Sequence, residues 1–186
     1  LIAAMEALVN TRLKQYIYGT DDETLASYLG KELLRTESTI AFAESCTGGL
    51  ASSLVTDVPG SSEYLLGSAV TYSNMAKHKL INVSEESLEA YGAVSWQVAC
   101  EMAQGVSELF GTTYGVGITG IAGPGGATED KPVGLVYMAV ADADGVKWAK
   151  HVFGGTRTDN KMRSALTAIS MVIDRIKEKE TENKDK

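Results

Sequence analysis

The sequence predicts an α/β protein, a three-layer α/β/α sandwich around a mixed sheet. Short apolar, β-prone runs alternate along the chain with helical segments, which is typical of a sheet covered by helices on both faces. Two later apolar runs flank a turn at residues 143–145 as a hairpin, so the sheet is not wholly parallel. The 186 residues suit one buried core.

The composition argues against several classes of protein. Hydrophobic residues make up 44% of the chain and charged residues 22%, as in ordinary globular proteins, and no run of about eighteen apolar residues predicts a membrane span. The formal charge of −7 argues against a nucleic-acid partner. The cysteines lack metal-ligand spacing and the histidines lie far apart, so we predict no metal site and a reducing, cytoplasmic location.

The first elements are expected in this order. Residues 1–21 form a lead-in with a short helix, which we interpret as the end of an upstream region. Residues 20–36 place acidic residues in a first turn before helical apolar spacing. Residues 39–43 suit a buried strand, and residues 48–58 follow as a helix.

The middle of the chain contains one strand and three helices. Residues 67–73 are the second expected strand, and their last serine is placed to cap a helix over residues 74–81. Ser84 and Ser95 are placed to cap two further helices, the first of which ends at Gly92.

The last third supplies the rest of the sheet and a long helix. Residues 114–120 are the third expected strand, and a glycine-rich segment follows them. The hairpin strands are expected within residues 133–142 and 146–155. After Thr158, apolar residues recur at helical spacing. These residues are Met162, Leu166, Ile169, Val172, Ile173 and Ile176. The main domain is predicted to span residues 22–178, followed by a charged, disordered tail at residues 179–186.

Three polar segments follow predicted strands at their carboxyl ends, where ligands collect in sheets of this class. They are residues 44–49 (ESCTGG), 71–77 (TYSNMAK) and 119–126 (TGIAGPGG). Ser45 lies in the sharp turn of the first segment, where it is a candidate nucleophile. The backbone N–H groups of the residues after it, at the start of a helix, suit a phosphate or a developing oxyanion.

A serine nucleophile needs a base. His78 and His151 are not obvious candidates, so lysine is the remaining option for Ser45. Lys77 lies in the first turn of a predicted helix, where the helix dipole, Lys79 and burial would all disfavour its charged form. A fall of about 2–3 units from a pKa of ~10.4 would suit a base near neutral pH.

The other candidates surround this pair. Tyr72 is expected to hydrogen-bond the serine, the lysine or the substrate. Arg157 is a candidate anion clamp and Arg163 a weaker one. Glu44 is interpreted either as a hydrogen-bond partner that supports the site or as a helix cap. The substrate-binding candidates are Glu44, Thr47, Gly48, Gly49, Thr119, Gly120, Ala122, Gly123 and Arg157.

Each candidate also has a structural interpretation. Serine is common in caps, a lysine such as Lys77 is most often at the surface, and glycine clusters are most often turns. Arg157 could simply pair with Asp159. Cys46 is the alternative nucleophile, although a small buried cysteine is the favoured interpretation. We interpret the following as structural or surface residues without a role in the site: His78, His151, Cys100, Trp96 and Trp148.

The segments AESCTGG, TYSNMAK and GIAGP, together with YGAVSWQVACEMAQG, resemble the CinA C-terminal domain family over residues 22–176. Stand-alone bacterial members of that family are nicotinamide-nucleotide amidases. The resemblance implies hydrolysis of the carboxamide of nicotinamide mononucleotide to nicotinic acid mononucleotide and ammonia, without a metal or a cofactor. It also implies a serine–lysine pair at Ser45 and Lys77, with Tyr72 in the adjoining motif.

The resemblance carries further expectations. Longer members have an N-terminal domain that resembles molybdopterin-binding proteins, so an upstream domain is expected. The alternative function is a non-catalytic nucleotide- or partner-binding domain linked to competence and DNA damage. A homo-oligomer is expected, with a dimer favoured. The catalytic motifs show no departure from the family pattern, which favours an active amidase.

Overall fold

The structure, a computed structural model, describes residues 2–13 and 17–184 and contains one five-stranded sheet. The strands are β1 (Ile40–Glu44), β2 (Leu65–Val70), β3 (Tyr114–Gly120), β4 (Leu135–Asp142) and β5 (Gly145–Val152), and their order in the sheet is β2-β1-β3-β4-β5. β1 pairs in parallel with β2 and β3, whereas β4 pairs antiparallel with β3 and β5. The predicted mixed sheet is therefore confirmed.

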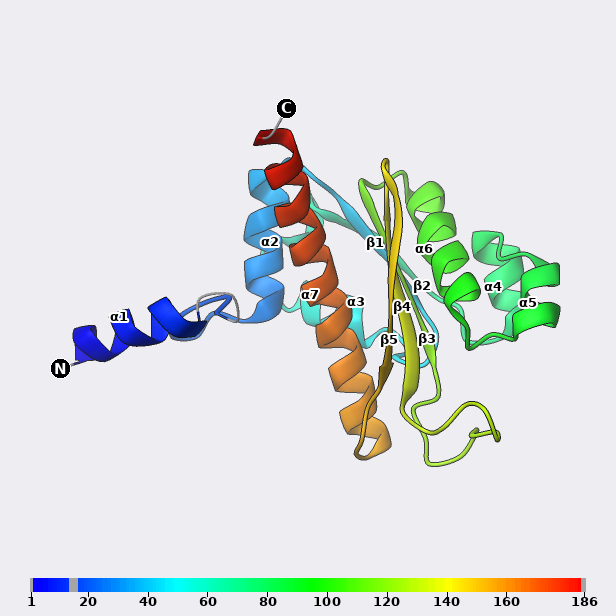
Figure 1. Cartoon of the computed structure of the whole chain (residues 1–186). Helices are drawn as coiled ribbons and strands as arrows, with labels where there is room; N and C mark the ends of the chain where they lie inside the picture. Colours follow the sequence, from blue (N-terminus) through cyan, green and yellow to red (C-terminus); the bar gives the residue numbers. More distant parts are fainter. Residues whose placement is uncertain (1, 14–16, 185–186) are drawn as a thin grey trace.

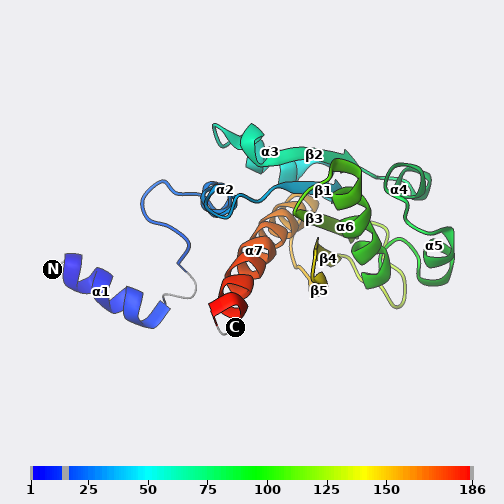
Figure 2. The same ribbon diagram turned by 90° about the horizontal axis from the view of Figure 1, so that it is seen from above.

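Helices cover both faces of the sheet (Figures 1 and 2). The helices are α1 (Ile2–Leu13), α2 (Leu25–Arg35), α3 (Leu50–Thr56), α4 (Asn74–Ile81), α5 (Glu85–Tyr91), α6 (Trp96–Phe110) and α7 (Arg157–Lys184), with a short 3-10 helix at Ser61–Glu63. In Figure 1, α2, α3 and α7 lie on one face, while α6 lies on the other with α4 and α5 beyond it. The three-layer α/β/α sandwich is confirmed.

Local sequence explains where the helices begin. Ser73, Ser84 and Ser95 each accept a hydrogen bond from the backbone N–H three residues further on, as predicted for N-caps. α5 ends at Gly92, which has a positive φ of 73°. These caps fix the starts of α4, α5 and α6, and thereby the segments that reach the carboxyl end of the sheet.

Glycines in β3 let α6 lie directly on the sheet. A β-carbon on Gly115 would lie 2.0 Å from the carbonyl oxygen of Ala103, and one on Gly117 would lie 2.2 Å from that of Ala99. Both positions therefore exclude any larger side chain. This close packing brings the turn before α6 to the carboxyl end of β3, where Thr119 donates a 2.7 Å hydrogen bond to the carbonyl of Ala93.

Two predicted boundaries shift. The first strand covers residues 40–44 rather than 39–43, and the second covers residues 65–70 rather than 67–73. The last sheet hydrogen bond on this side runs from the N–H of Thr71 to the carbonyl of Glu44. Beyond it the chain turns away, so that Ser73 can cap α4.

The prediction of a disordered tail at residues 179–184 is wrong, because α7 continues to Lys184. Ion pairs hold this part of the helix: Lys179 contacts Asp142 and Asp144, and Glu180 contacts Arg35. Residues 185–186 lie outside the described residues.

The predicted short helix in the lead-in is observed as α1, which stands away from the sandwich in both views (Figures 1 and 2). Its larger apolar side chains, Ile2, Met5, Leu8 and Leu13, are exposed. Residues 1 and 14–16 of the lead-in lie outside the described residues. Of the helices that the structure describes, none has the length and apolar character needed to cross a bilayer.

Candidate active site

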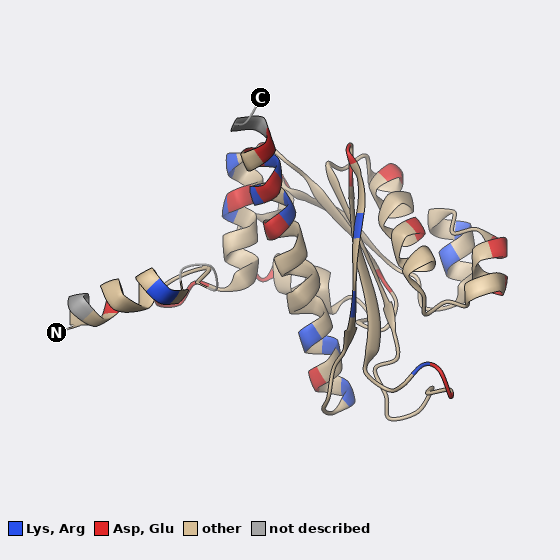
Figure 3. Cartoon of the chain, in the orientation of Figure 1, with Lys and Arg blue, Asp and Glu red and all other residues tan. Residues whose placement is uncertain are grey.

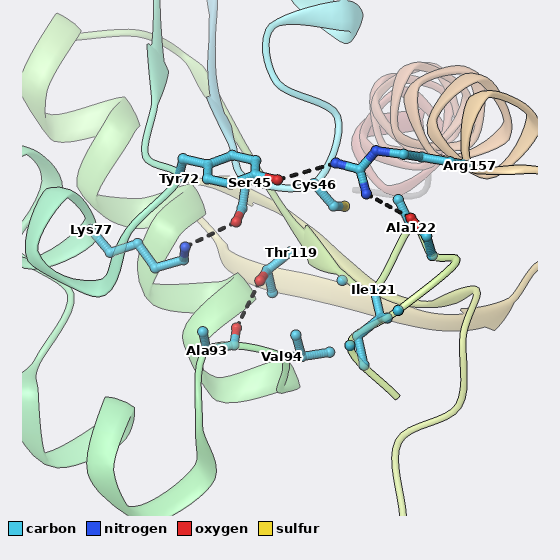
Figure 4. A pocket seen from close by; sticks show the side chains of 14 residues that line it. Ser45, Cys46, Tyr72, Lys77, Ala93, Val94, Thr119, Ile121, Ala122 and Arg157 are labelled. Carbon is cyan, nitrogen blue, oxygen red and sulfur yellow. Dashed lines mark hydrogen bonds between the residues drawn. The ribbon is translucent and has the colours of Figure 1, made fainter. Parts of the chain in front are cut away.

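A cavity of about 270 Å³ opens at the carboxyl ends of β1 and β3 (Figure 4). The three polar segments predicted from the sequence meet there, joined by the turn before α6 and the start of α7. The lining residues are Ser45, Cys46, Tyr72, Lys77, Ala93, Val94, Thr119, Gly120, Ile121, Ala122, Gly123, Gly125, Gly126 and Arg157. The three segments therefore meet at one edge of the sheet, as the sequence predicts.

Ser45 and Lys77 are in direct contact on one wall of this cavity. Nζ of Lys77 lies 3.0 Å from Oγ of Ser45 and donates a 2.8 Å hydrogen bond to the carbonyl of Thr71. Ser45 is still anchored to the sheet, because its N–H donates to the carbonyl of Ile118. The serine is 9% exposed and the lysine 1% exposed, so both reactive atoms are shielded from bulk water.

Burial determines the chemistry of Lys77. Removal from water disfavours the ammonium form and lowers the pKa of the amine to about 8, while the nearby Cys46 acts weakly in the opposite direction. Burial, one of the three effects predicted from the sequence to disfavour the charged form of Lys77, is thus the main cause of the lowered pKa. The amine therefore has a substantial neutral fraction near physiological pH and can accept a proton from Ser45.

Glu44 does not face the cavity, so its prediction as a substrate-binding residue is wrong. Its fully buried carboxylate accepts hydrogen bonds from the N–H groups of Gly49 (2.9 Å), Ala51 (3.1 Å) and Ser52 (2.9 Å), and from the Ser52 hydroxyl. The alternative interpretation of Glu44 as a helix cap is confirmed. This cap fixes the turn that presents Ser45.

Because Glu44 caps the helix, one of the backbone N–H groups predicted to stabilise an oxyanion is already occupied. The N–H of Gly49 donates to Glu44 and is not free for a ligand, so the prediction of Gly49 as a substrate-binding residue and oxyanion donor is wrong. Thr47 and Gly48 do not line the cavity either. Of residues 45–49, Ser45 and Cys46 are the ones that line the cavity.

Cys46 is a poor nucleophile in this setting. Burial raises the pKa of its thiol to about 12. The backbone N–H groups of Cys46 and Thr47 lower this pKa and offset only part of the effect of burial. Since the thiolate is the reactive form of cysteine, the geometry favours Ser45 over Cys46.

Arg157 ties three segments together at the mouth of the cavity (Figure 4). It donates from Nη1 to the carbonyl of Gly123 at 2.8 Å and from Nη2 to the hydroxyl of Tyr72 at 3.1 Å. The alternative pairing with Asp159 is not observed, because the Asp159 carboxylate accepts from the backbone and hydroxyl of Thr156. Tyr72 is 63% exposed, and its hydroxyl bonds the guanidinium rather than Ser45 or Lys77.

The glycine-rich segment forms the opposite wall. Thr119, Gly120, Ala122 and Gly123 all line the cavity, as expected for substrate-binding candidates. The hydroxyl of Thr119 is already bonded to the carbonyl of Ala93, and its effect is to hold the turn at residues 93–94 against the site. Nothing in the sequence singled out Ala93, Val94 or the carbonyl of Thr71.

Three of the residues interpreted as structural or surface residues, His78, Trp96 and Trp148, have contacts of that kind. Nδ1 of His78 lies 2.9 Å from the carbonyl of Val83, and the rings of Trp96 and Trp148 stack with centroids 5.4 Å apart. Arg163, the weaker anion candidate, donates to the carbonyl of Gly154. Within residues 2–13 and 17–184, no group of three or more His, Cys, Asp or Glu side chains is arranged to hold a metal ion.

Comparison with known proteins gives a consistent result. The family model described as CinA C-terminal domain matches residues 22–176. A CinA-like protein of Endomicrobium trichonymphae is 49% identical over 160 residues, covering 86% of this chain and 37% of that protein. A CinA-like protein of Syntrophomonas wolfei is 47% identical over 164 residues, covering 88% and 39%. The chain thus spans about two fifths of the length of these relatives.

Solved structures share the fold. The crystal structure of competence/damage inducible protein CihA from Agrobacterium tumefaciens superimposes with a TM-score of 0.80 at 37% identity, covering 85% of this chain and 97% of that one. A CinA superfamily protein from Klebsiella pneumoniae has the same TM-score at 25% identity, covering 83% and 96%.

Proposed function

The chain belongs to the CinA C-terminal domain family, and on that premise we propose that it hydrolyses the carboxamide of nicotinamide mononucleotide to give nicotinic acid mononucleotide and ammonia. The proposal makes it an amidase of pyridine-nucleotide salvage that works through a serine–lysine pair. No metal or cofactor takes part in the proposed reaction.

One observation carries this proposal above the others. A buried amine with its pKa lowered to about 8 lies 3.0 Å from a serine hydroxyl, at the edge of a cavity of about 270 Å³. A lysine whose only role was structural would be expected to pair with a carboxylate when buried. Lys77 instead contacts two neutral oxygens, which leaves its nitrogen able to act as a base.

The first half of the reaction forms an acyl-enzyme. Oγ of Ser45 attacks the carboxamide carbon while neutral Lys77 accepts the hydroxyl proton. The positive pyridinium ring withdraws electrons from the carbonyl and makes it more reactive. The oxyanion is assigned to the backbone N–H of Cys46, which directly follows the nucleophile and belongs to a residue that lines the cavity. Lys77 then passes its proton to the departing nitrogen as the C–N bond breaks, and ammonia leaves.

The second half restores the enzyme. A water molecule takes the place of ammonia, and Lys77, neutral again, accepts one of its protons as the water oxygen attacks the ester carbon. The ester bond to Ser45 breaks, and Lys77 returns the proton to Oγ. Nicotinic acid mononucleotide is released with no net change in the protein.

The test is ammonia release from nicotinamide mononucleotide by the purified protein in the presence of a chelator. We expect turnover that Ser45→Ala abolishes. Turnover that disappears with chelator would indicate metal-dependent hydrolysis. Binding of the mononucleotide without any release of ammonia would instead support the alternative, a non-catalytic binding domain.

The proposal extends to the setting of the protein. The cytoplasmic location expected from the sequence stays a prediction; Cys46 and Cys100 are both free thiols. The expected homodimer and the expected upstream domain stay predictions, and analytical ultracentrifugation of the purified chain would test the first.

A further inference from the structure

The first two turns of α7 carry a group of basic side chains, although the formal net charge of the chain is −7 (Figure 3). They are Arg157, Lys161 and Arg163, with Asp159 between them. The carboxylate of Asp159 accepts hydrogen bonds from the N–H and hydroxyl of Thr156, and it forms no direct ion pair with the three basic side chains. A patch of positive charge therefore lies at the end of the sheet that holds the cavity.

The three basic side chains differ in what they contact. Arg157 donates to Gly123 and Tyr72, and Arg163 donates to Gly154. Among the residues that the structure describes, Lys161 has neither a hydrogen bond nor an ion pair, although it is only partly exposed. Its ammonium group therefore has three donors that a ligand could use.

Lys161 lies beside the turn that carries the nucleophile. Its Nζ is 3.9 Å from the point that a β-carbon on Gly48 would occupy, and Gly48 is exposed with a positive φ of 66°. The neighbouring Asn160 donates to the carbonyl of Ala122, which fixes this part of α7 against the glycine-rich wall. Lys161 is also four residues from Arg157 and thus on the same side of the helix.

We propose that Lys161 binds the phosphate of a phosphomonoester substrate, next to the mouth formed by Arg157. This assignment rests on the proposed amidase function, for which the phosphomonoester is the mononucleotide. Gly48 follows Ser45 by three residues, so the two lie within about 11 Å of each other. A substrate with its carboxamide at Ser45 can place its phosphate at that distance, beyond the ribose.

The contacts of Arg157 and Lys161 indicate a different role for each side chain. Arg157 has two of its N–H groups committed to the walls of the cavity, so its main role is to shape the mouth. Lys161 has all of its donors free of the described protein groups, and an ammonium suits phosphate as a compact point charge. The exposed backbone of Gly48 leaves room for the phosphate oxygens beside it.

The experiment compares nicotinamide mononucleotide with nicotinamide riboside, which carries the same carboxamide and no phosphate. In Lys161→Met, kcat/KM for the mononucleotide should fall about ten- to hundredfold, the usual loss for one hydrogen bond to a charged group. The value for the riboside should stay within about twofold. Lys161→Arg keeps the charge and should retain most of the preference for the mononucleotide.

Lys177→Met is the matched control. It removes the same charge from the same helix about 24 Å away, at an exposed lysine that lies over the ring of Tyr28. We expect it to leave both activities unchanged. An equal loss for both substrates in Lys161→Met, or no loss for either, would overturn the assignment of the phosphate to Lys161.

A binding measurement separates this assignment from the proposed function. Calorimetry with ribose 5-phosphate needs no reaction, and we expect binding to the wild type that weakens about ten- to hundredfold in Lys161→Met. If the wild type released no ammonia but bound ribose 5-phosphate through Lys161, the amidase proposal would fail and the phosphate site would stand. Equal affinity of both proteins for this probe, or no binding to either, would remove the site.

Discussion

The two ends of the sheet each bury a charged group, and they treat it in opposite ways. At the carboxyl ends of β1 and β3, Lys77 is 1% exposed and contacts the hydroxyl of Ser45 and the carbonyl of Thr71. At the other end, the Asp142 carboxylate is fully buried, and Arg175 holds it with hydrogen bonds of 2.6 and 3.1 Å. Lys179 adds a contact at 3.2 Å.

The pKa values record this difference. Burial would raise the pKa of Asp142, but the hydrogen bonds from Arg175, the Asp144 backbone and Lys179 outweigh it and lower the pKa instead. For Lys77 the structure shows no carboxylate partner among the described residues, and burial lowers the pKa of the amine to about 8. A buried charge with partners stabilises one arrangement of the protein, whereas a buried lysine without a counter-ion is available as a base.

Replacing Lys77 should produce the largest effect. Lys77→Met removes the only proposed proton acceptor, so turnover should fall by about 10⁴-fold or more, while circular dichroism shows the fold unchanged. Lys79→Met, on the same helix with an exposed side chain, is the control and should keep its activity. Normal turnover in Lys77→Met would remove the lysine from the mechanism.

At the end of the sheet that holds Asp142, a substitution should reduce stability and leave activity intact. Asp142→Ala leaves Arg175 buried without its partner, so the free energy of unfolding should fall by about 3–5 kcal/mol in chemical denaturation. The specific activity of the folded fraction should be retained, because Asp142 lies at the far end of the sheet from the cavity. A loss of activity without a loss of stability would show that the two ends are coupled.

Burial of Lys77 should lower the stability of the protein as well as provide a base for the reaction. Lowering its pKa from 10.5 to about 8 corresponds to about 3 kcal/mol. Between these pH values the unfolded chain binds more protons than the native one, so the stability of the wild type should rise with pH. Lys77→Met should therefore gain most relative to wild type below pH 8, and lose that advantage towards pH 10.5. A constant difference across this window would contradict burial as the cause of the shift.

Activity should report the same pKa directly. Because the neutral amine is the active form, kcat/KM should approach a tenfold fall per pH unit below the pKa of about 8, should fall about fiftyfold from pH 8 to pH 6, and should level off above pH 8. A rate profile over pH 6–9 in a buffer of constant ionic strength would measure this. A flat profile over that range would mean that the base has a much lower pKa.

Cys46 should give the smallest effect. Its pKa of about 12 keeps the thiol protonated, so Cys46→Ala should change kcat by no more than about threefold and leave the pH profile unaltered. Complete loss of turnover, together with inactivation of the wild type by iodoacetamide, would move the nucleophile to sulfur.

The sequence by itself determined the elements and the types of residue at the site. The serine caps of α4, α5 and α6 act over three residues, so their effect is visible in any local stretch. The placement of Ser45 and Lys77 at one edge follows from the parallel pairing of β1 and β2, since the segments after parallel strands emerge at the same end. The resemblance to a known family then made their pairing specific.

Only the tertiary structure decided which partner each polar group takes. Glu44 faces α3 and not the cavity because the chain folds back on it. Lys161 reaches Gly48 across more than a hundred residues of sequence, and no local pattern marks that contact. The burial of Lys77 likewise depends on segments that meet only in the folded protein. Desolvation and hydrogen bonding act through space, so they set the pKa values and the roles of these side chains only after the chain has packed.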